Sequence, residues 1–162
     1  MSIFTKYLIC FLVSMVPLIE LRGAIPIGLG MGLPMLPTYI ICVLGNMVPV
    51  PIIYLFARKV LIWGSDKPYI GKFFKFFLVK GEKAGRKLEE KAGRGLTAAL
   101  LLFVGIPLPG TGAWTGTLGG SILNMKFKDV LIACMGGVLL AGVLIALASA
   151  GLLGVFSALF AV

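Results

Sequence analysis

The lengths of the apolar segments most constrain what this chain can fold into. Residues 130–150 (VLIACMGGVLLAGVLIALASA) contain no charged residue and match the roughly 20 residues that a helix needs to cross a bilayer. Residues 38–57 form a second such segment, which is interrupted by Asn46 and two prolines. The apolar residues run continuously instead of alternating, which favours helices over a barrel. With 59% hydrophobic residues and a mean hydropathy of +1.07, the composition predicts an all-α integral membrane protein.

Four other apolar runs are too short to cross a bilayer: residues 7–19, 24–33, 96–106 and 113–123. Runs of about 10–14 residues are typical of re-entrant segments. Each pair is joined by a break rich in glycine and proline, so we expect two re-entrant helical hairpins, at 7–33 and 96–123. A signal peptide is the alternative for the first run, but no small-residue cleavage site follows it.

The charges gather between the apolar blocks. Residues 58–95 carry eleven basic and four acidic residues, a net charge of +7 out of +9 for the chain. A basic loop flanked by membrane segments is typical of the cytoplasmic side, whereas nucleic-acid binding is the less favoured interpretation. Aromatic and basic residues recur there at helical spacing, which predicts an amphipathic helix on anionic headgroups; a solvated connector is the alternative.

These features divide the chain into two similar halves, 1–57 and 96–162, joined by the 58–95 linker. Each half has a hairpin followed by a transmembrane helix (38–57 or 130–150), and the second half adds an apolar tail. A cytoplasmic linker makes the two hairpins enter from opposite sides, with both termini outside. We therefore predict inverted repeats, a plan in which substrate sites lie at the midplane where broken helices meet.

The two breaks, "PLIELRGA" and "PLPGTGA", are the expected tips of one site. Irregular backbone at membrane depth is tolerated where it lines a cavity or is buried in protein. Glycine permits tight turns and proline ends helices, so we assign turns to Gly23, Gly110 and Gly112 and helix ends to Pro17, Pro26, Pro107 and Pro109.

Glu20 and Arg22 are charges inside an apolar region, where each costs roughly 2.5–3.5 kcal/mol. One interpretation is a mutual ion pair that holds the first tip. The other assigns Arg22 to an anionic substrate group and Glu20 to a proton that couples transport to a gradient.

Three neutral residues complete the predicted substrate site. Thr111 supplies a hydroxyl at the second tip, and Trp114 is either an interfacial anchor or a wall of the site. Asn46 hydrogen-bonds either a neighbouring helix or the substrate.

No metal, cofactor or enzymatic site is predicted. The chain has no histidine, no paired carboxylates and no nucleophile constellation, which argues against a lipid-phosphate enzyme. Its cysteines, Cys10, Cys42 and Cys134, stand alone in apolar runs and are interpreted as packing residues.

The motifs "ELRGAIPIG" and "FVGIPLPGTGAWTG", separated by a basic linker, resemble the small multidrug export protein family over about residues 14–150. More distantly, the chain resembles the DedA/VTT membrane proteins, which are implicated in moving undecaprenyl phosphate or phospholipids between leaflets. That resemblance implies two inverted re-entrant hairpins. It places the acidic and basic pattern of the first hairpin on Glu20, Arg22 and Gly23, whereas the arginines of the second DedA hairpin have no counterpart at Thr111 and Gly112.

We therefore expect a transporter or flippase of the bacterial inner membrane, proton-coupled, that moves an amphiphile, with a lipid phosphate favoured. An exporter of lipophilic cationic drugs and a non-transporting, scramblase-like scaffold are the alternatives. Glycine-rich faces around Gly136, Gly137 and Gly142 predict a homodimer, unless these glycines pack against the chain's own hairpins.

Overall fold

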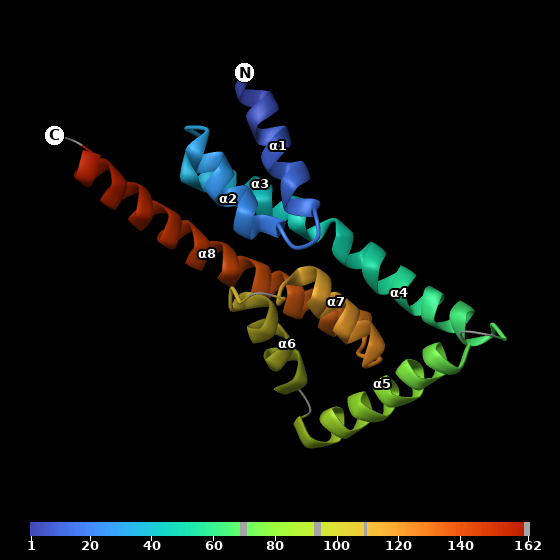
Figure 1. Cartoon of the computed structure of the whole chain (residues 1–162). Helices are drawn as coiled ribbons and strands as arrows, with labels where there is room; N and C mark the ends of the chain where they lie inside the picture. The colour runs from blue at the N-terminus through green and yellow to red at the C-terminus, as the bar shows by residue number, and fades with distance from the viewer. Residues whose placement is uncertain (69–70, 93–94, 109, 161–162) are drawn as a thin grey trace.

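The computed structural model describes residues 1–68, 71–92, 95–108 and 110–160, and every regular element within these ranges is an α-helix (Figure 1). The predicted all-helical class is confirmed. The elements are α1 (Ile3–Met15), α2 (Glu20–Gly30), α3 (Met35–Met47), α4 (Pro49–Ser65), α5 (Gly71–Ala92), α6 (Gly95–Gly105), α7 (Ala113–Ile122) and α8 (Phe127–Phe160).

Within the described residues, two helical segments are long and apolar enough to cross a membrane: Met35–Ser65 and Phe127–Gly151. The predicted 38–57 helix lies inside the first and the 130–150 helix inside the second. The first segment bends at Val48, between α3 and α4, because Pro49 has no backbone N–H to continue the helical hydrogen bonds. The apolar tail belongs to α8, which continues to Phe160.

Two short helices and a break precede each long segment, and their re-entrant arrangement stays a prediction. The helices α1 and α2 are separated by residues 16–19, and α6 and α7 by residues 106–112. The expectation for Pro26 is wrong: α2 continues through this proline to Gly30. Proline removes a single helical hydrogen bond, and the flanking turns of α2 keep theirs.

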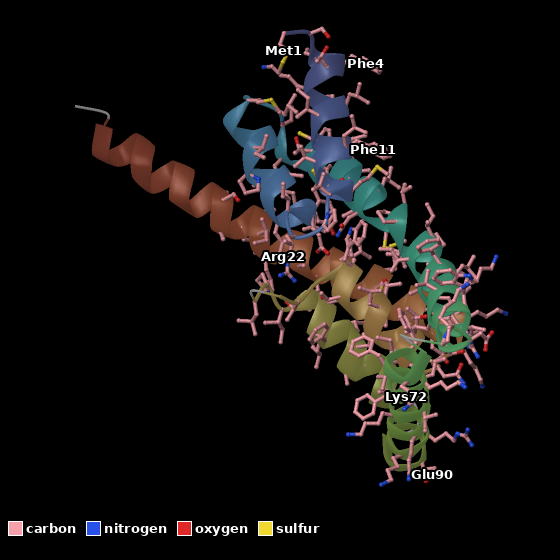
Figure 2. All side chains as sticks on the ribbon, turned by 45° about the vertical axis from the view of Figure 1, so that its right-hand side comes forward. Met1, Phe4, Phe11, Arg22, Lys72 and Glu90 are labelled. Carbon is pink, nitrogen blue, oxygen red and sulfur yellow. The ribbon has the colours of Figure 1, made fainter. Side chains whose placement is uncertain are left out.

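The basic linker contains the predicted helix, α5, although α4 first extends into the linker as far as Ser65. The helix α5 lies at the opposite end of the molecule from the N-terminus (Figure 1). Figure 2 shows the same separation between Met1 and the α5 residues Lys72 and Glu90.

Small residues let the helices approach closely. A Cβ on Gly28 of α2 would lie 2.4 Å from the Thr38 side chain of α3, and one on Gly45 would lie 2.1 Å from Ser14 Oγ of α1. Three glycines of α8 also face the chain's own side chains: Leu101 at Gly136, Val104 at Gly137 and Tyr39 at Gly142. These glycines therefore pack the chain's own helices.

The two halves pack in matching ways. The helix α1 packs against α3 as α6 packs against α8. The second short helix of each half also crosses to the long helix of the other half, so that α2 contacts α8 and α7 contacts α4. This interlocking brings the α1–α2 and α6–α7 breaks together near the centre of the molecule (Figure 1).

Candidate functional site

The first break places Glu20 in the interior. The chain turns through Leu18 and Glu20, both of which have positive φ angles (70° and 51°) that side-chain-bearing residues rarely adopt. Such strain is of order 1–3 kcal/mol per residue and persists only where the surroundings enforce it. The turn exposes Leu18 and buries Glu20, whose side chain is only 5% exposed.

Glu20 caps a helix in the other half of the chain. Its Oε1 accepts a hydrogen bond from the backbone N–H of Trp114 at 3.0 Å, and its Oε2 accepts one from the N–H of Ala113 at 3.3 Å. These groups lie in the first turn of α7, where N–H groups have no partner within the helix. The residue before α7 is Gly112, which has no side chain to supply a cap. A carboxylate at this end also interacts favourably with the helix dipole.

Arg22 binds the C-terminal end of α6, the helix that precedes α7 in the chain. Its Nη1 donates to the carbonyl oxygen of Leu108 at 2.8 Å, and its Nη2 lies within donating distance of the Val104 and Ile106 carbonyls, at 3.2 and 3.3 Å. These carbonyls belong to the end of α6 and the following break, where backbone acceptors lack helical partners. Figure 2 shows Arg22 midway between the two ends of the molecule.

Thr111 holds the second break in shape. Its hydroxyl lies 2.9 Å from the Ile106 carbonyl and 2.8 Å from that of Leu108, and it accepts a hydrogen bond from Arg22 Nη2 at 3.0 Å. With a single proton, the hydroxyl donates to one carbonyl at a time. Thr111 therefore joins the irregular backbone to the guanidinium.

Gly112 is required by space and by conformation. Its φ is +142°, and a Cβ built on it would lie 2.4 Å from Glu20 Oε2. Gly110 has a φ of +81° but open space around it. The two glycines thus make the turn, and Gly112 in addition makes room for the carboxylate.

Trp114 adds a reciprocal link between the breaks. Its indole Nε1 donates to the carbonyl oxygen of Met15, the last residue of α1, at 3.2 Å. Three helix ends thus receive a partner from the opposite half: α7 from Glu20, α6 from Arg22 and α1 from Trp114. We call this arrangement the tip tie. In it, Glu20 hydrogen-bonds the first turn of α7, and Arg22 hydrogen-bonds the end of α6 and the second break.

The other predicted site residues lie around the tip tie or apart from it. Pro17 and Pro107 fall within the two breaks, and Pro109 lies outside the described residues. The expected turn at Gly23 is wrong, because Gly23 is inside α2, where a Cβ would lie 2.5 Å from the Ile19 side chain. Asn46 is 1% exposed on α3, and neither polar atom of its side chain has a hydrogen-bond partner.

A cavity of about 410 Å³ opens beside the tip tie. We call it the tip cavity. Both breaks line it, with the polar residues Glu20, Arg22, Thr111 and Thr115, the indole of Trp114, and apolar side chains that include Leu18 and Leu118. Its volume is within the range of small-molecule sites, about 300–1,000 Å³. It is a mixed polar and apolar space at the point where the two halves meet.

Sequence reasoning missed a second set of links between the halves. The hydroxyl of Tyr54 donates to the Met125 carbonyl at 2.5 Å, and Arg58 hydrogen-bonds the side chain of Asn124. Both connect α4 to the turn between α7 and α8. Within the first half, Lys6 of α1 donates to the Met31 carbonyl at the end of α2. Of these residues, Lys6 alone could have been noticed in the sequence, as a lysine within an apolar helix. Nothing in the sequence distinguishes Tyr54 from the other aromatic residues.

Metal binding has no support in the described part of the chain, where no group of three His, Cys, Asp or Glu side chains is placed to hold an ion. The three cysteines are free and buried.

The comparison with protein families finds a match over most of the chain. Residues 20–144 match the family described as "Putative small multi-drug export protein". No curated protein and no solved structure matches the chain. The matched region begins at Glu20 and includes both partners of the tip tie, α5 and most of α8. Since the match extends over most of the sequence and agrees with the apolar helices, this helical membrane protein belongs to the small multidrug export protein family.

Proposed function

We propose that this protein is a transporter that moves an amphiphile through the tip cavity and uses the tip tie as its gate. The family description supports a role in export. The observation that carries the proposal is that Glu20 and Arg22 bind the helix ends of the opposite break.

Capping the ends of α6 and α7 does not by itself require charged residues from the other half of the chain. Helix ends are commonly capped by neutral residues of the same segment, such as serine, asparagine or glycine. Here two residues that are costly at membrane depth come from the other half of the chain. Separating the breaks therefore releases both charges and their backbone partners together. Such an element favours two discrete states, one tied and one open, over a continuous range.

Protonation of Glu20 provides the coupling. The carboxylate accepts two N–H groups at the positive end of the α7 dipole, and protonation removes the charge that makes these bonds strong. The cation nearest to it along the chain is Arg22, which is engaged by the second break. A proton on Glu20 therefore favours the open state, in which the remaining N–H groups of Arg22 are also released to an anionic substrate group.

The membrane arrangement is part of the proposal. The breaks are the tips of two inverted re-entrant hairpins in a bacterial inner membrane, with α5 on the cytoplasmic side against anionic headgroups and both termini outside. The matching contacts of the halves and the distance between α5 and the N-terminus support it.

The favoured substrate is a lipid phosphate, because a guanidinium suits phosphate and Glu20 is already engaged. The resemblance to DedA/VTT proteins points the same way and stays a prediction. The family description favours a second candidate, a lipophilic cationic drug.

Transport across reconstituted vesicles tests the proposal. The probes are fluorescently labelled phosphatidic acid and a quaternary ammonium dye, each with and without an imposed pH gradient. We expect gradient-dependent movement of the labelled phosphatidic acid by the native protein and loss of that dependence in Glu20→Gln. Movement of the dye alone would support the cation exporter. Equal, gradient-independent exchange of lipid by both proteins would indicate a scramblase-like scaffold and contradict the proposal.

A further inference from the structure

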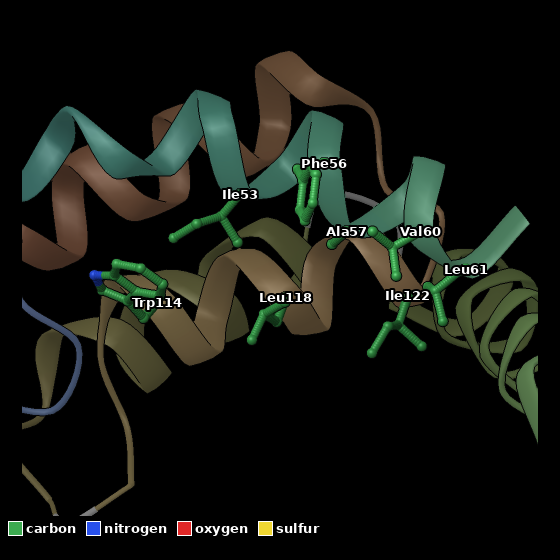
Figure 3. Close-up of a pocket in the computed structure, with 8 residues that line it drawn as sticks. All are labelled: Ile53, Phe56, Ala57, Val60, Leu61, Trp114, Leu118 and Ile122. Atoms are coloured by element: carbon green, nitrogen blue, oxygen red, sulfur yellow. The ribbon is translucent and has the colours of Figure 1, made fainter. Parts of the chain in front are cut away.

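A second, apolar cavity continues from the tip cavity along α7. It has a volume of about 320 Å³ and lies between α4 and α7. Trp114 and Leu118 line both cavities. We call this second cavity the α4–α7 groove. Figure 3 shows Trp114 at one end of it and Leu61 and Ile122 at the other.

We propose that the two cavities form one binding site for a single-chain amphiphile with an anionic headgroup. The headgroup occupies the tip cavity beside Arg22, and the hydrocarbon chain lies in the α4–α7 groove. The choice of substrate class rests on the proposed function, but binding can be measured without transport.

The two cavities differ in chemistry as the two parts of an amphiphile do. The groove is lined by apolar side chains: Ile53, Phe56, Ala57, Val60, Leu61, Trp114, Leu118 and Ile122. From Trp114 to Ile122, α7 rises about 12 Å at 1.5 Å per residue. Trp114 stands at the junction, where an indole presents an apolar face along with its polar N–H. A hydrocarbon chain therefore has an apolar path that begins at the polar cavity.

The sign of the headgroup follows from which charge is still available. Glu20 is 5% exposed, and both of its carboxylate oxygens already accept backbone N–H groups. Arg22 is half-buried, and it is the single cationic residue among the described residues that line the tip cavity. Among the described residues, its Nη1 donates to the Leu108 carbonyl alone and so uses one of its two N–H groups. The second N–H group favours an anion, and a phosphate offers several acceptors to a guanidinium.

Fluorescence of Trp114 reports binding directly. The chain has two tryptophans, and Trp63 is exposed on α4 outside both cavities. The substitution Trp63→Phe leaves Trp114 as the reporter. In uncharged maltoside micelles this variant is titrated with dodecyl phosphate, dodecyltrimethylammonium and dodecylphosphocholine, and separately with inorganic phosphate. Because the three dodecyl compounds share the same hydrocarbon chain, they partition similarly into the micelle. Differences in their affinity therefore report the headgroup.

We expect a saturable change with dodecyl phosphate, at least about tenfold tighter than with dodecyltrimethylammonium, because the anion alone gains charge-assisted hydrogen bonds. Inorganic phosphate should bind far more weakly because it leaves the groove empty. Equal responses to the three dodecyl compounds would show an ordinary lipid-facing surface and overturn the proposal. Tighter binding of the cation would also overturn it.

A groove variant tests the path of the chain without touching the tip tie. Ala57→Leu adds bulk inside the groove, and Ala98→Leu adds the same bulk on the exposed surface of α6, outside both cavities. In the Trp63→Phe background, Ala57→Leu should weaken dodecyl phosphate several-fold and Ala98→Leu should leave it unchanged. Unchanged affinity in both would overturn the assignment of the groove. Binding as expected with no transport would instead count against the proposed function alone.

Discussion

Replacing Glu20 with glutamine tests the tip tie most sensitively, because the two side chains have nearly the same shape. The carboxylate accepts one hydrogen bond at each oxygen, from Ala113 and Trp114. Glutamine keeps one accepting oxygen, but its NH₂ group faces the other N–H as a second donor. The variant thus loses one bond and turns the remaining one from charge-assisted to neutral.

The size of the effect follows from these two changes. A hydrogen bond to a charged group contributes about 1.5–3 kcal/mol and a neutral one about 0.5–1.5 kcal/mol. Losing one charged bond and weakening the other by about 1 kcal/mol gives a loss of about 2.5–4 kcal/mol in the free energy of unfolding. For a chain of this size, that corresponds to a fall in Tm of roughly 5–16 °C.

Two measurements check the prediction. Thermal unfolding in maltoside micelles reports stability. Spin labels at Leu18→Cys and Leu108→Cys, both exposed side chains on the two breaks, report the distance between the breaks. We expect Glu20→Gln to lower Tm and to broaden the distance distribution. The matched control is Glu90→Gln, which removes an exposed carboxylate on α5 and should change neither. An unaltered Tm together with an unaltered distance distribution in Glu20→Gln would refute the reasoning.

Three further substitutions have expected outcomes in the same unfolding assay. Gly112→Ala places a Cβ against the Glu20 carboxylate at a positive φ and should destabilise about as much as Glu20→Gln; Gly119→Ala, in open space on α7, should be neutral or stabilise by up to about 1 kcal/mol. Asn46→Leu removes a buried amide without partners and should stabilise by about 1–3 kcal/mol; a fall in Tm would reveal a polar partner. Tyr54→Phe leaves a buried carbonyl unpaired and should cost about 1–3 kcal/mol, and a smaller loss would mean that water replaces the hydroxyl.

The sequence indicated the two breaks between short helices, but not every helix end. Segment length and the positions of Pro17, Pro107 and Gly112 predicted two short helices and one long segment in each half. These are local properties, since proline and glycine act on their own backbone. Pro26 was misjudged because a single missing hydrogen bond does not end a helix whose other turns are intact.

The hydrogen bonds that link the two halves could not be predicted from the sequence. Glu20 and Ala113 are 93 positions apart, and neither the spacing nor the charge pattern indicates that they meet. In the sequence, the second break has no charged residue, and the arginines of the second DedA hairpin have no counterpart there. The structure gives the physical reason: the second break offers bare backbone N–H and C=O groups, and the charged residues of the first break bind them.

The central claim is that both breaks lie deep in the membrane and meet there. It is tested by the depth of nitroxide labels at Leu18→Cys and Leu108→Cys in lipid bilayers, from their relative collision with oxygen and with a water-soluble nickel complex. We expect both labels to lie near the bilayer centre and to collide measurably with the nickel complex through the tip cavity. Labels at opposite bilayer surfaces would make the breaks ordinary turns between full crossings and would rule out a site at the membrane midplane.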